Sequence, residues 1–301
     1  MIRRPPRSTP SNSSAASDVY KRQNKIVYNP TSVALFALSN LQLYNSGNKK
    51  ALNNFELACR WLISNGIHTK IGLIFPHDFD HPIYGLKAGW ISAMTQGLAV
   101  SCFIRRYILS GDIVFLELAK EAAKPLQEEI KNGGVAYYDN NSNVWLEEVP
   151  SNTMPHILNG FIYGIMGLYD LYCILGDACI ENFIIRAIST LEKNIHKYDL
   201  GYWSKYQLNP PIPATLSYHK LHIQQLLFLY KISQQMIFKE YAIKFASYIK
   251  HRSNNLFAKY IGYVQYVNAL VKTMRLQGIH YVIHRMIGGI RSVVVSNSAL
   301  V

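Results

Sequence analysis

The sequence is poor in charge and in cysteine. Charged residues make up 16% of the 301 residues and hydrophobic residues 49%, which is the composition of a folded chain with a substantial core, in one large domain or two small ones. The four cysteines form no CxxC pair, and each lies in an apolar helical pattern: Cys59, Cys102, Cys173 and Cys179. We therefore expect small buried side chains, no disulfide framework and a reducing compartment.

The sequence also lacks the short motifs of several enzyme classes. It contains no GxSxG, no P-loop, no GxGxxG after a strand and no HExxH, which disfavours serine-hydrolase and nucleotide-driven chemistry. No uncharged apolar run reaches the length of a membrane span, about 18 residues. The nearest run, 157–175, is interrupted by Asn159 and Asp170 and predicts a buried inner helix. We therefore expect no stable membrane insertion.

The net charge of +13 is concentrated at the two ends of the chain. Residues 250–301 carry seven Lys and Arg residues and no acidic residue, and residues 1–23 carry five against one Asp. The long middle segment is therefore close to neutral, and no nucleic-acid-binding motif accompanies the basic ends. We expect no nucleic acid partner, although a basic tail can contact an anionic polymer or a membrane surface.

Residues 1–23 differ from the rest of the chain. They show no hydrophobic periodicity and no apolar stretch of the kind that a secretory signal needs. The string MIRRPPRSTPSNSSAASDVYKRQ resembles translated sequencing-adapter read-through. We therefore expect a non-native or disordered leader and leave it out of the fold.

From about residue 30 the chain is a succession of helices joined by turns. Hydrophobic periodicity predicts helices at about 30–43, 51–64, 90–109, 112–131, 155–175, 178–195, 217–233, 236–251 and 254–276. Pro125 should kink or shorten the fourth of these helices. Alternating strand patterns are nearly absent, apart from a strand-like run at Tyr137 and Tyr138.

Three long irregular segments interrupt these helices, at 67–88, 132–152 and 198–215. Loops of this length in a compact domain usually carry function. Helical hairpins with long loops at one end predict an all-α fold over residues 24–251, an α/α toroid (an incomplete α/α barrel) with long cleft-lining loops. A plain helical bundle is the alternative. Residues 252–301 are predicted to form a basic helical C-terminal extension.

Several proton-transferring groups fall in or beside these loops. Glu147 and Glu148 are adjacent carboxylates, and burial of either would raise its pKa towards the range of a general base, although such a pair in a loop is more often solvated. Tyr206 and Tyr218 flank a proline-rich loop, and a phenol can donate a proton to a carbanion. The 21 tyrosines also suit sugar binding, with the filling of a helical core as the alternative.

Two histidine-containing segments have the residue types of metal ligands. His219 and His222 stand three apart at the start of a helix, but no third ligand follows nearby, so hydrogen bonding to a substrate or helix capping is favoured. The run HDFDH at 77–81 lies between Pro76 and Pro82, where His and Asp are ordinary turn residues. We therefore predict no metal site.

Five sequence motifs, taken in order, resemble one carbohydrate-modifying family. They are GWISAMTQG at 89–97, WLEE at 145–148, HILNGFIYGIMGLYDLY at 156–172, the YDLG turn at 198–201 and YHKLHIQQL at 218–226. Over roughly residues 30–250 the chain is similar to the C-terminal catalytic domain of D-glucuronyl C5-epimerases. The resemblance implies an α/α toroid that converts D-glucuronate into L-iduronate units in heparosan-type polymers.

The resemblance also implies residue roles. Glu148 matches the family's catalytic carboxylate, and Tyr206 and Tyr218 match its catalytic tyrosines. Two positions depart from the family pattern: Val149 stands where the family often has tyrosine, and Asn209 stands where the animal enzymes have an arginine. The substrate-binding residues that we predict alongside are Trp90, Gln96, Arg105, Trp145, Glu147, Asn159, Lys205, Asn209, His219 and His222.

The chemistry of a C5-epimerase agrees with these residue types. Inverting C5 of a uronate removes a proton beside a carboxylate and returns one to the opposite face, which needs two acid–base groups and no cofactor. Stabilising the carbanion requires a cation at the substrate carboxylate, for which Arg105, Lys205 and His219 are candidates.

The expected partner is an anionic uronate-containing polysaccharide, with a homodimer as one assembly to consider. We expect a cytoplasmic enzyme of surface-polysaccharide synthesis. Two alternatives remain. A uronate lyase shares the first proton abstraction and then expels the C4 substituent, and a polysaccharide-binding protein on the same toroid binds the polymer without chemistry.

Overall fold

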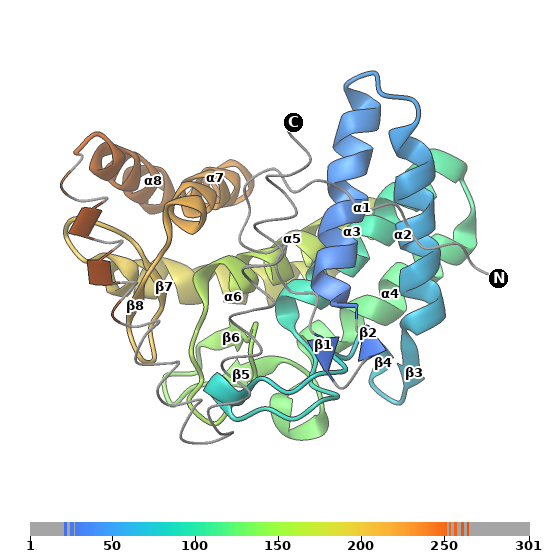
Figure 1. Ribbon diagram of the computed structural model, residues 1–301, viewed down its shortest axis with the longest axis horizontal. Coiled ribbons are helices and arrows are strands. Elements are labelled where there is room, and N and C mark those ends of the chain that lie inside the picture. The colour runs from blue at the N-terminus through green and yellow to red at the C-terminus, as the bar shows by residue number, and fades with distance from the viewer. Residues whose placement is uncertain are drawn as a thin grey trace.

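A computed structural model describes residues 21–22, 25–26 and 28–251, with scattered positions between 253 and 264 (Figure 1). Helices dominate the described part of the chain. They are α1 Pro30–Asn45, α2 Ala51–Asn65, α3 Ala93–Ser110, α4 Ile113–Gln127, α5 Leu158–Leu175, α6 Ala178–Asn194, α7 Leu216–Ser233 and α8 Met236–Ile249. Single turns of 3-10 helix lie at Pro82–Tyr84, Ile130–Asn132 and Ile195–Tyr198.

The strands of the described residues are two or three residues long and pair only as antiparallel hairpins. These are β1 Lys21–Arg22 with β2 Lys25–Ile26, β3 Ile67–Thr69 with β4 Gly72–Ile74, β5 Ala136–Tyr138 with β6 Val144–Leu146, and β7 Lys205–Gln207 with β8 Ile212–Pro213. The last three hairpins fall inside the three long segments predicted as irregular. Each of these segments therefore contains one short β-hairpin.

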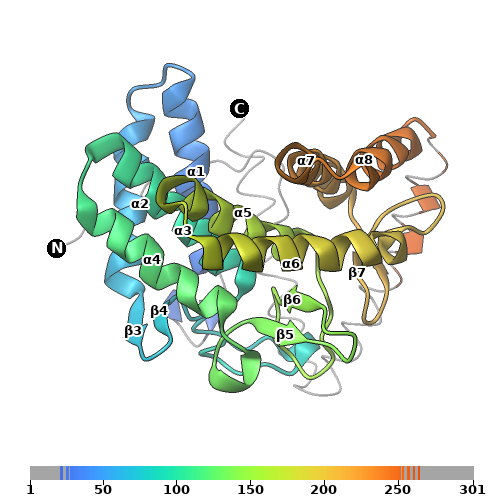
Figure 2. The same ribbon diagram turned by 180° about the vertical axis from the view of Figure 1, so that it is seen from behind.

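Consecutive helices form antiparallel hairpins that follow one another along an arc, from α1 and α2 at one end to α7 and α8 at the other (Figures 1 and 2). Within the arc α3 packs against both α1 and α5, and α5 packs against α7. Met94 meets Asn159 near the start of both α3 and α5, and Ser101 meets Asp170 further along both, so these inner helices run parallel. This is the predicted incomplete α/α toroid.

Two of the hairpin turns use the same dipeptide. Gly111 and Gly176 end α3 and α5 with φ of 68° and 62°, in the left-handed region that glycine adopts without strain. Asp112 and Asp177 follow directly and accept hydrogen bonds from backbone N–H groups in the first turns of α4 and α6. In both turns glycine ends the inner helix and the aspartate after it caps the outer helix, so the chain reverses direction within two residues.

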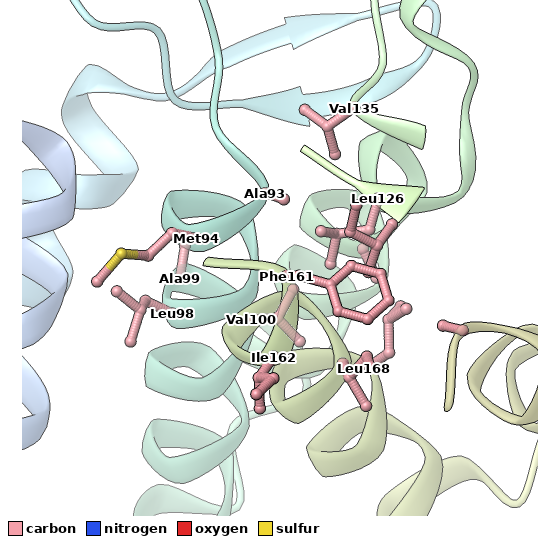
Figure 3. Packing of buried hydrophobic residues seen from close by; sticks show 14 of the residues in the cluster. Ala93, Met94, Leu98, Ala99, Val100, Leu126, Val135, Phe161, Ile162 and Leu168 are labelled. Carbon is pink, nitrogen blue, oxygen red and sulfur yellow. The ribbon is translucent and has the colours of Figure 1, made fainter. Parts of the chain in front are cut away.

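The densest packing lies between α3 and α5. A Cβ atom on Gly97 would come within 2.2 Å of the Tyr163 carbonyl oxygen, and one on Gly167 within 2.4 Å of the Gly97 carbonyl oxygen. Only glycine lets the two backbones approach this closely. Large apolar side chains, among them Leu98 and Phe161, pack around this contact (Figure 3).

Differences from the sequence-based expectations have local causes. Helix α4 ends at Gln127 rather than near 131, two residues after Pro125, which has no N–H to donate to the carbonyl four residues earlier. Cysteines 59 and 102 are buried as predicted, whereas Cys173 and Cys179 are exposed at the tip of the α5–α6 hairpin, which corrects that prediction. Most of the leader and of the C-terminal extension lies outside the described residues.

Helix α5 is long and apolar enough to cross a membrane by length and composition alone. However, 56% of its most hydropathic 18-residue window is buried inside the fold. It packs against α3, α6 and α7, which is the position of a core helix, as its interrupting polar residues led us to expect.

Candidate active site

The three long segments meet at the N-terminal ends of the inner helices. The Leu208 backbone N–H donates to the Pro155 carbonyl at 2.9 Å, which joins the β7–β8 segment to the start of α5. The Tyr84 hydroxyl donates to Gln207 Oε1 at 2.5 Å, which joins the first segment to the third. The Glu147 carbonyl accepts a hydrogen bond from the first residue of α3. Side chains that are far apart in sequence therefore gather at the side of the arc where the inner helices begin.

Glu148 is the carboxylate at the centre of this cluster. Asn159 Nδ2 donates to its Oε2 atom at 3.0 Å, and the Tyr206 hydroxyl donates to its Oε1 atom at 3.2 Å. The backbone N–H of Gly160, in the first turn of α5, is a third donor. A Cβ on Gly160 would lie 2.3 Å from both Cβ and Oε2 of Glu148, so the carboxylate rests directly on the helix backbone.

The environment of Glu148 shifts its proton affinity. Burial raises its pKa to about 7, the hydrogen bonds from Tyr206, Asn159 and Gly160 oppose the shift, and the nearby Glu147 charge adds to it. A carboxyl group with a pKa near 7 exists in both forms at neutral pH. It can therefore accept a proton and release it again at similar cost.

The two tyrosines of the sequence motifs lie together next to this carboxylate, with Tyr206 hydrogen-bonded to Glu148 and Tyr218 against Tyr206. Tyr206 lies on β7 and Tyr218 in the first turn of α7, whose N-terminus is capped by Thr215. Their ring centroids are 4.8 Å apart. Burial, together with the negative charge of Glu148, raises the pKa of Tyr206 well above its usual value, so this phenol stays protonated.

Tyr84 and Tyr163 also belong to the cluster, and sequence analysis missed both. Burial raises the pKa of Tyr84, and the charge of Glu148 adds to the shift. Burial and Glu148 act in the same way on the pKa of Tyr163, which lies on α5 one turn after Asn159. Tyr163 stood inside a quoted motif and could have been found by its helical spacing from Asn159, whereas Tyr84 lies in an irregular segment without any periodic signal.

Three of the predicted substrate-binding residues lie at the surface of the loop cluster. Trp90 is partly exposed, stacks on His77 with ring centroids 3.8 Å apart, and donates from Nε1 to the Phe79 carbonyl. Asn209 is exposed, and Lys205 is partly exposed with its ammonium group hydrogen-bonded to a backbone carbonyl. All three remain candidates for contact with a polymer.

Four of the predicted residues are buried and make contacts inside the protein. Gln96 accepts from the Phe75 N–H and donates to the carbonyls of Leu73 and Ala122. Trp145 is 3% exposed, and Asn159 holds Glu148. The fourth, Glu147, is fully buried and hydrogen-bonded to a histidine.

Arg105 lies on α3 but not near Glu148. It pairs with Asp170 of α5, and eleven residues separate it from Met94, which is about 16 Å along a helix axis. The candidate cation for a substrate carboxylate is therefore at the opposite end of the α3–α5 pair, where its guanidinium is already engaged.

His219 and His222 lie in a buried network. The Ser204 hydroxyl is 2.7 Å from Nδ1 of His219 and 2.9 Å from Nδ1 of His222, and His219 Nε2 lies 2.9 Å from the Phe245 carbonyl. Burial lowers the pKa of His219 to about 4 and that of His222 to about 3. Both rings are neutral at pH 7, so neither supplies a positive charge there.

The residues with metal-ligand chemistry form other contacts. Among the described residues no group of three or more His, Cys, Asp and Glu side chains could hold a metal ion. His77 of the HDFDH run lies 3.2 Å from the Thr31 hydroxyl and stacks on Trp90, and burial lowers its pKa to about 3. This run builds an aromatic corner next to the loop cluster.

Two curated proteins are similar in sequence to this chain. The chain is 27% identical over 172 residues to an uncharacterized protein of Methanocaldococcus jannaschii, covering 56% of each chain. It is 28% identical over 216 residues to a D-glucuronyl C5-epimerase of Caenorhabditis elegans, covering 64% of this chain and 34% of that protein. The chain thus spans about half the length of the first relative and a third of the second.

A solved structure and a family model complete the comparison. The crystal structure of a sugar epimerase from a ruminal bacterium matches with a TM-score of 0.57 and 15% identity, over 75% of this chain and 60% of that one, which establishes the toroid fold. Residues 70–247 match the family described as D-glucuronyl C5-epimerase C-terminus. Because this match spans more than half of the sequence, the chain belongs to the D-glucuronyl C5-epimerase C-terminal family.

Proposed function

We propose that this chain is a polysaccharide uronate C5-epimerase that converts D-glucuronate into L-iduronate units of a heparosan-like polymer. The observation that carries the proposal is Glu148, a carboxyl group with a pKa near 7 that shares a hydrogen bond with Tyr206. Family membership supports sugar epimerisation, and the name of the relative from Caenorhabditis elegans supports glucuronate as the substrate.

In the first step the Glu148 carboxylate accepts the proton from C5 of the glucuronate. The electron pair of the broken C5–H bond moves into the adjacent carboxylate group of the sugar, giving an enolate-like intermediate. Glu148 suits this step because it is ionised in about half of the molecules at pH 7, and because Asn159 and Tyr206 hold its two oxygens in place.

In the second step Tyr218 donates its phenolic proton to the opposite face of C5, which forms the inverted C–H bond and leaves a phenolate. The proton on Glu148 must then return to Tyr218. The Tyr206 hydroxyl is hydrogen-bonded to Glu148, and the Tyr206 ring lies against the Tyr218 ring. Tyr206 is therefore the residue that we assign to carry the proton from Glu148 to Tyr218. The cycle is balanced in protons and needs no redox partner.

The test is incubation of the full chain with heparosan, and separately with its N-sulfated form, in deuterated water, followed by proton NMR. We expect deuterium at C5 and L-iduronate signals with at least one polymer. Glu148→Gln and Tyr218→Phe should each lower the exchange rate about 1000-fold, in line with the loss of a proton-transfer group. The control Glu117→Gln, which changes an exposed carboxylate of α4, should exchange at the wild-type rate.

Other outcomes would replace this proposal with a specific alternative. An unsaturated product that absorbs near the short-wavelength ultraviolet edge would identify a uronate lyase, which expels the C4 substituent after the same abstraction. Polymer binding by a folded protein without exchange at C5 would identify a binding protein. Exchange that survives Glu148→Gln would remove Glu148 from the mechanism.

A further inference from the structure

Glu147 and Glu148 are neighbours in sequence but have different surroundings. Glu147 is fully buried, and its carboxylate is hydrogen-bonded to His156. The His156 ring contacts Glu147 Oε1 through Nδ1, and the His156 backbone N–H donates to Oε2 at 3.2 Å. A buried carboxylate held at both oxygens by one residue is not free to bind a polymer.

His156 is itself held in an unusual conformation. Its φ of 50° lies in the left-handed region, which residues with a Cβ atom adopt rarely. Its ring stacks on Trp145, with centroids 4.2 Å apart, and its carbonyl accepts the Tyr198 hydroxyl at 2.7 Å. The ring, the backbone N–H and the carbonyl of one residue are thus all engaged, which is how a protein maintains a conformation of this kind.

The position of His156 links it to both parts of the acid–base site. It lies three residues before Asn159 and four before Gly160, both of which bind Glu148. The carbonyl of the preceding residue, Pro155, accepts the backbone N–H groups of Leu208 and Asn209 at 2.9 and 3.2 Å, just after Tyr206 on the chain. A shift of the segment around His156 would therefore move Glu148 and Tyr206 relative to each other.

We propose that the Glu147–His156 pair is a positioning device for the acid–base site. It holds the segment that leads into α5 in the one conformation that brings Glu148 and Tyr206 together, and it places the Glu147 carboxylate beside Glu148. The inference rests on the proposed function, and it replaces substrate binding as the role of Glu147.

The charged and titratable neighbours of this pair define its electrostatic effect. The groups around Glu148 are Glu147, Tyr84, Tyr163, Tyr206 and, next to Tyr206, Tyr218. Those around Glu147 are His156, Tyr198, Tyr84 and Glu148. The pKa values of Tyr84, Tyr163, Tyr198 and Tyr206 are raised, so these phenols are neutral at pH 7. Among these neighbours Glu147 is therefore the residue whose replacement by an uncharged side chain should lower the pKa of Glu148.

Two substitutions of His156 separate its hydrogen bond from its ring. His156→Phe keeps a ring over Trp145 but removes the Nδ1 contact, whereas His156→Asn keeps a donor near the Nδ1 position and tolerates a positive φ. For C5 exchange we expect His156→Phe to lower kcat about 30-fold with KM within about threefold, and His156→Asn to stay within about fivefold of wild type. Equal loss in both variants, or a loss confined to KM, would overturn the positioning role.

Glu147→Gln tests the electrostatic part without relying on activity. In protein carrying ¹³C-labelled glutamate, the carboxyl signal of Glu148, assigned by its loss in Glu148→Gln, should titrate about one pH unit lower in Glu147→Gln than in wild type. The acid limb of the kcat profile should move by the same amount. An unchanged titration midpoint would overturn the inference. Absence of exchange in the wild-type protein would instead overturn the proposed function, and the titration would still decide the role of Glu147.

Discussion

The two ends of the parallel α3–α5 pair each hold a carboxylate, and the two carboxylates differ in kind. At the N-terminal end Glu148 meets neutral donors, Asn159 and Tyr206 among them, and its pKa rises to about 7. At the other end Asp170 pairs with Arg105, with side chains 24% and 37% exposed. A partly buried carboxylate without a cation has a raised pKa, whereas one paired with a guanidinium forms a partly exposed ion pair.

The N-terminus of α5 lies against Glu148, and its effect on the pKa of Glu148 can be compared with the effect of burial. The N-terminus of α5 favours a negative charge by about 0.3–1 kcal/mol, which is less than one pKa unit. The pKa of Glu148 nevertheless rises from 4.5 to about 7, because burial outweighs the helix and the hydrogen bonds together. The position of the carboxylate in the fold thus decides its chemistry more than any single contact does.

The largest effect predicted from this comparison of the two helix ends comes from breaking the close approach of Gly160 to Glu148. In Gly160→Ala the added Cβ, 2.3 Å from Glu148 atoms, must displace the carboxylate, and C5 exchange should fall about 100-fold. The matched control at the other end is Gly176→Ala. Nothing lies within 4 Å of its added Cβ, so its φ of 62° should cost about 1 kcal/mol of stability and leave exchange unchanged. Wild-type exchange in Gly160→Ala would contradict the geometry of the site.

A second prediction compares the two carboxylates by stability. Because the folded-state pKa of Glu148 is raised, the folded protein binds a proton that the unfolded chain releases, so this group costs stability as the pH rises from about 4.5 to 7. At pH 8.5 Glu148→Gln should therefore have a free energy of unfolding up to about 3 kcal/mol higher than wild type, measured by urea denaturation. At pH 4.5 little of this gain should remain. Asp170→Asn should show no gain at pH 8.5. A Glu148→Gln variant less stable than wild type at pH 8.5 would count against a raised folded-state pKa of Glu148.

A third prediction concerns the rate of exchange as a function of pH. If ionised Glu148 is the base, kcat should rise about tenfold between pH 6 and pH 8, with a midpoint near 7. Asp170→Asn should leave this midpoint where it is, since the ion pair lies at the other end of the helices. A profile that is flat from pH 6 to 8 would exclude Glu148 as the rate-limiting base.

The smallest predicted effect is at the ion pair itself. Arg105→Ala should leave C5 exchange within about twofold of wild type and lower the free energy of unfolding by no more than about 1 kcal/mol, because the pair is partly exposed and screened. A tenfold rise in KM would instead restore Arg105 as a substrate-binding residue.

The helices and their turns could be predicted from local sequence. Gly111 with Asp112, and Gly176 with Asp177, carry stop and start signals that act over a few residues, and the apolar periodicity of α3, α5 and α6 is equally local. Pro125 shortened its helix for the same reason. The exposed Cys173 and Cys179 were predicted wrongly because an apolar pattern does not show that a hairpin tip projects into water.

The site was predictable only in part. The family motifs pointed to Glu148, Tyr206 and Tyr218 as candidates, whereas the contact of Tyr84 with Gln207 and the pairing of Glu147 with His156 carry no sequence signal. Tyr84 contacts Gln207 across more than a hundred residues of sequence, and the contacts of His156 depend on a positive φ that residues with a Cβ atom adopt rarely.

The sequence by itself determined where helices begin, end and turn back, since capping, periodicity and glycine conformations act within a few residues. Only the tertiary structure decided which of two adjacent glutamates acquired a pKa of about 7. Side chains on consecutive residues point in different directions, so Glu147 was directed against His156 and Glu148 against Asn159, Gly160 and Tyr206. The burial and the neighbouring charge that raise the pKa of Glu148 to about 7 arise only when the three loop segments pack together.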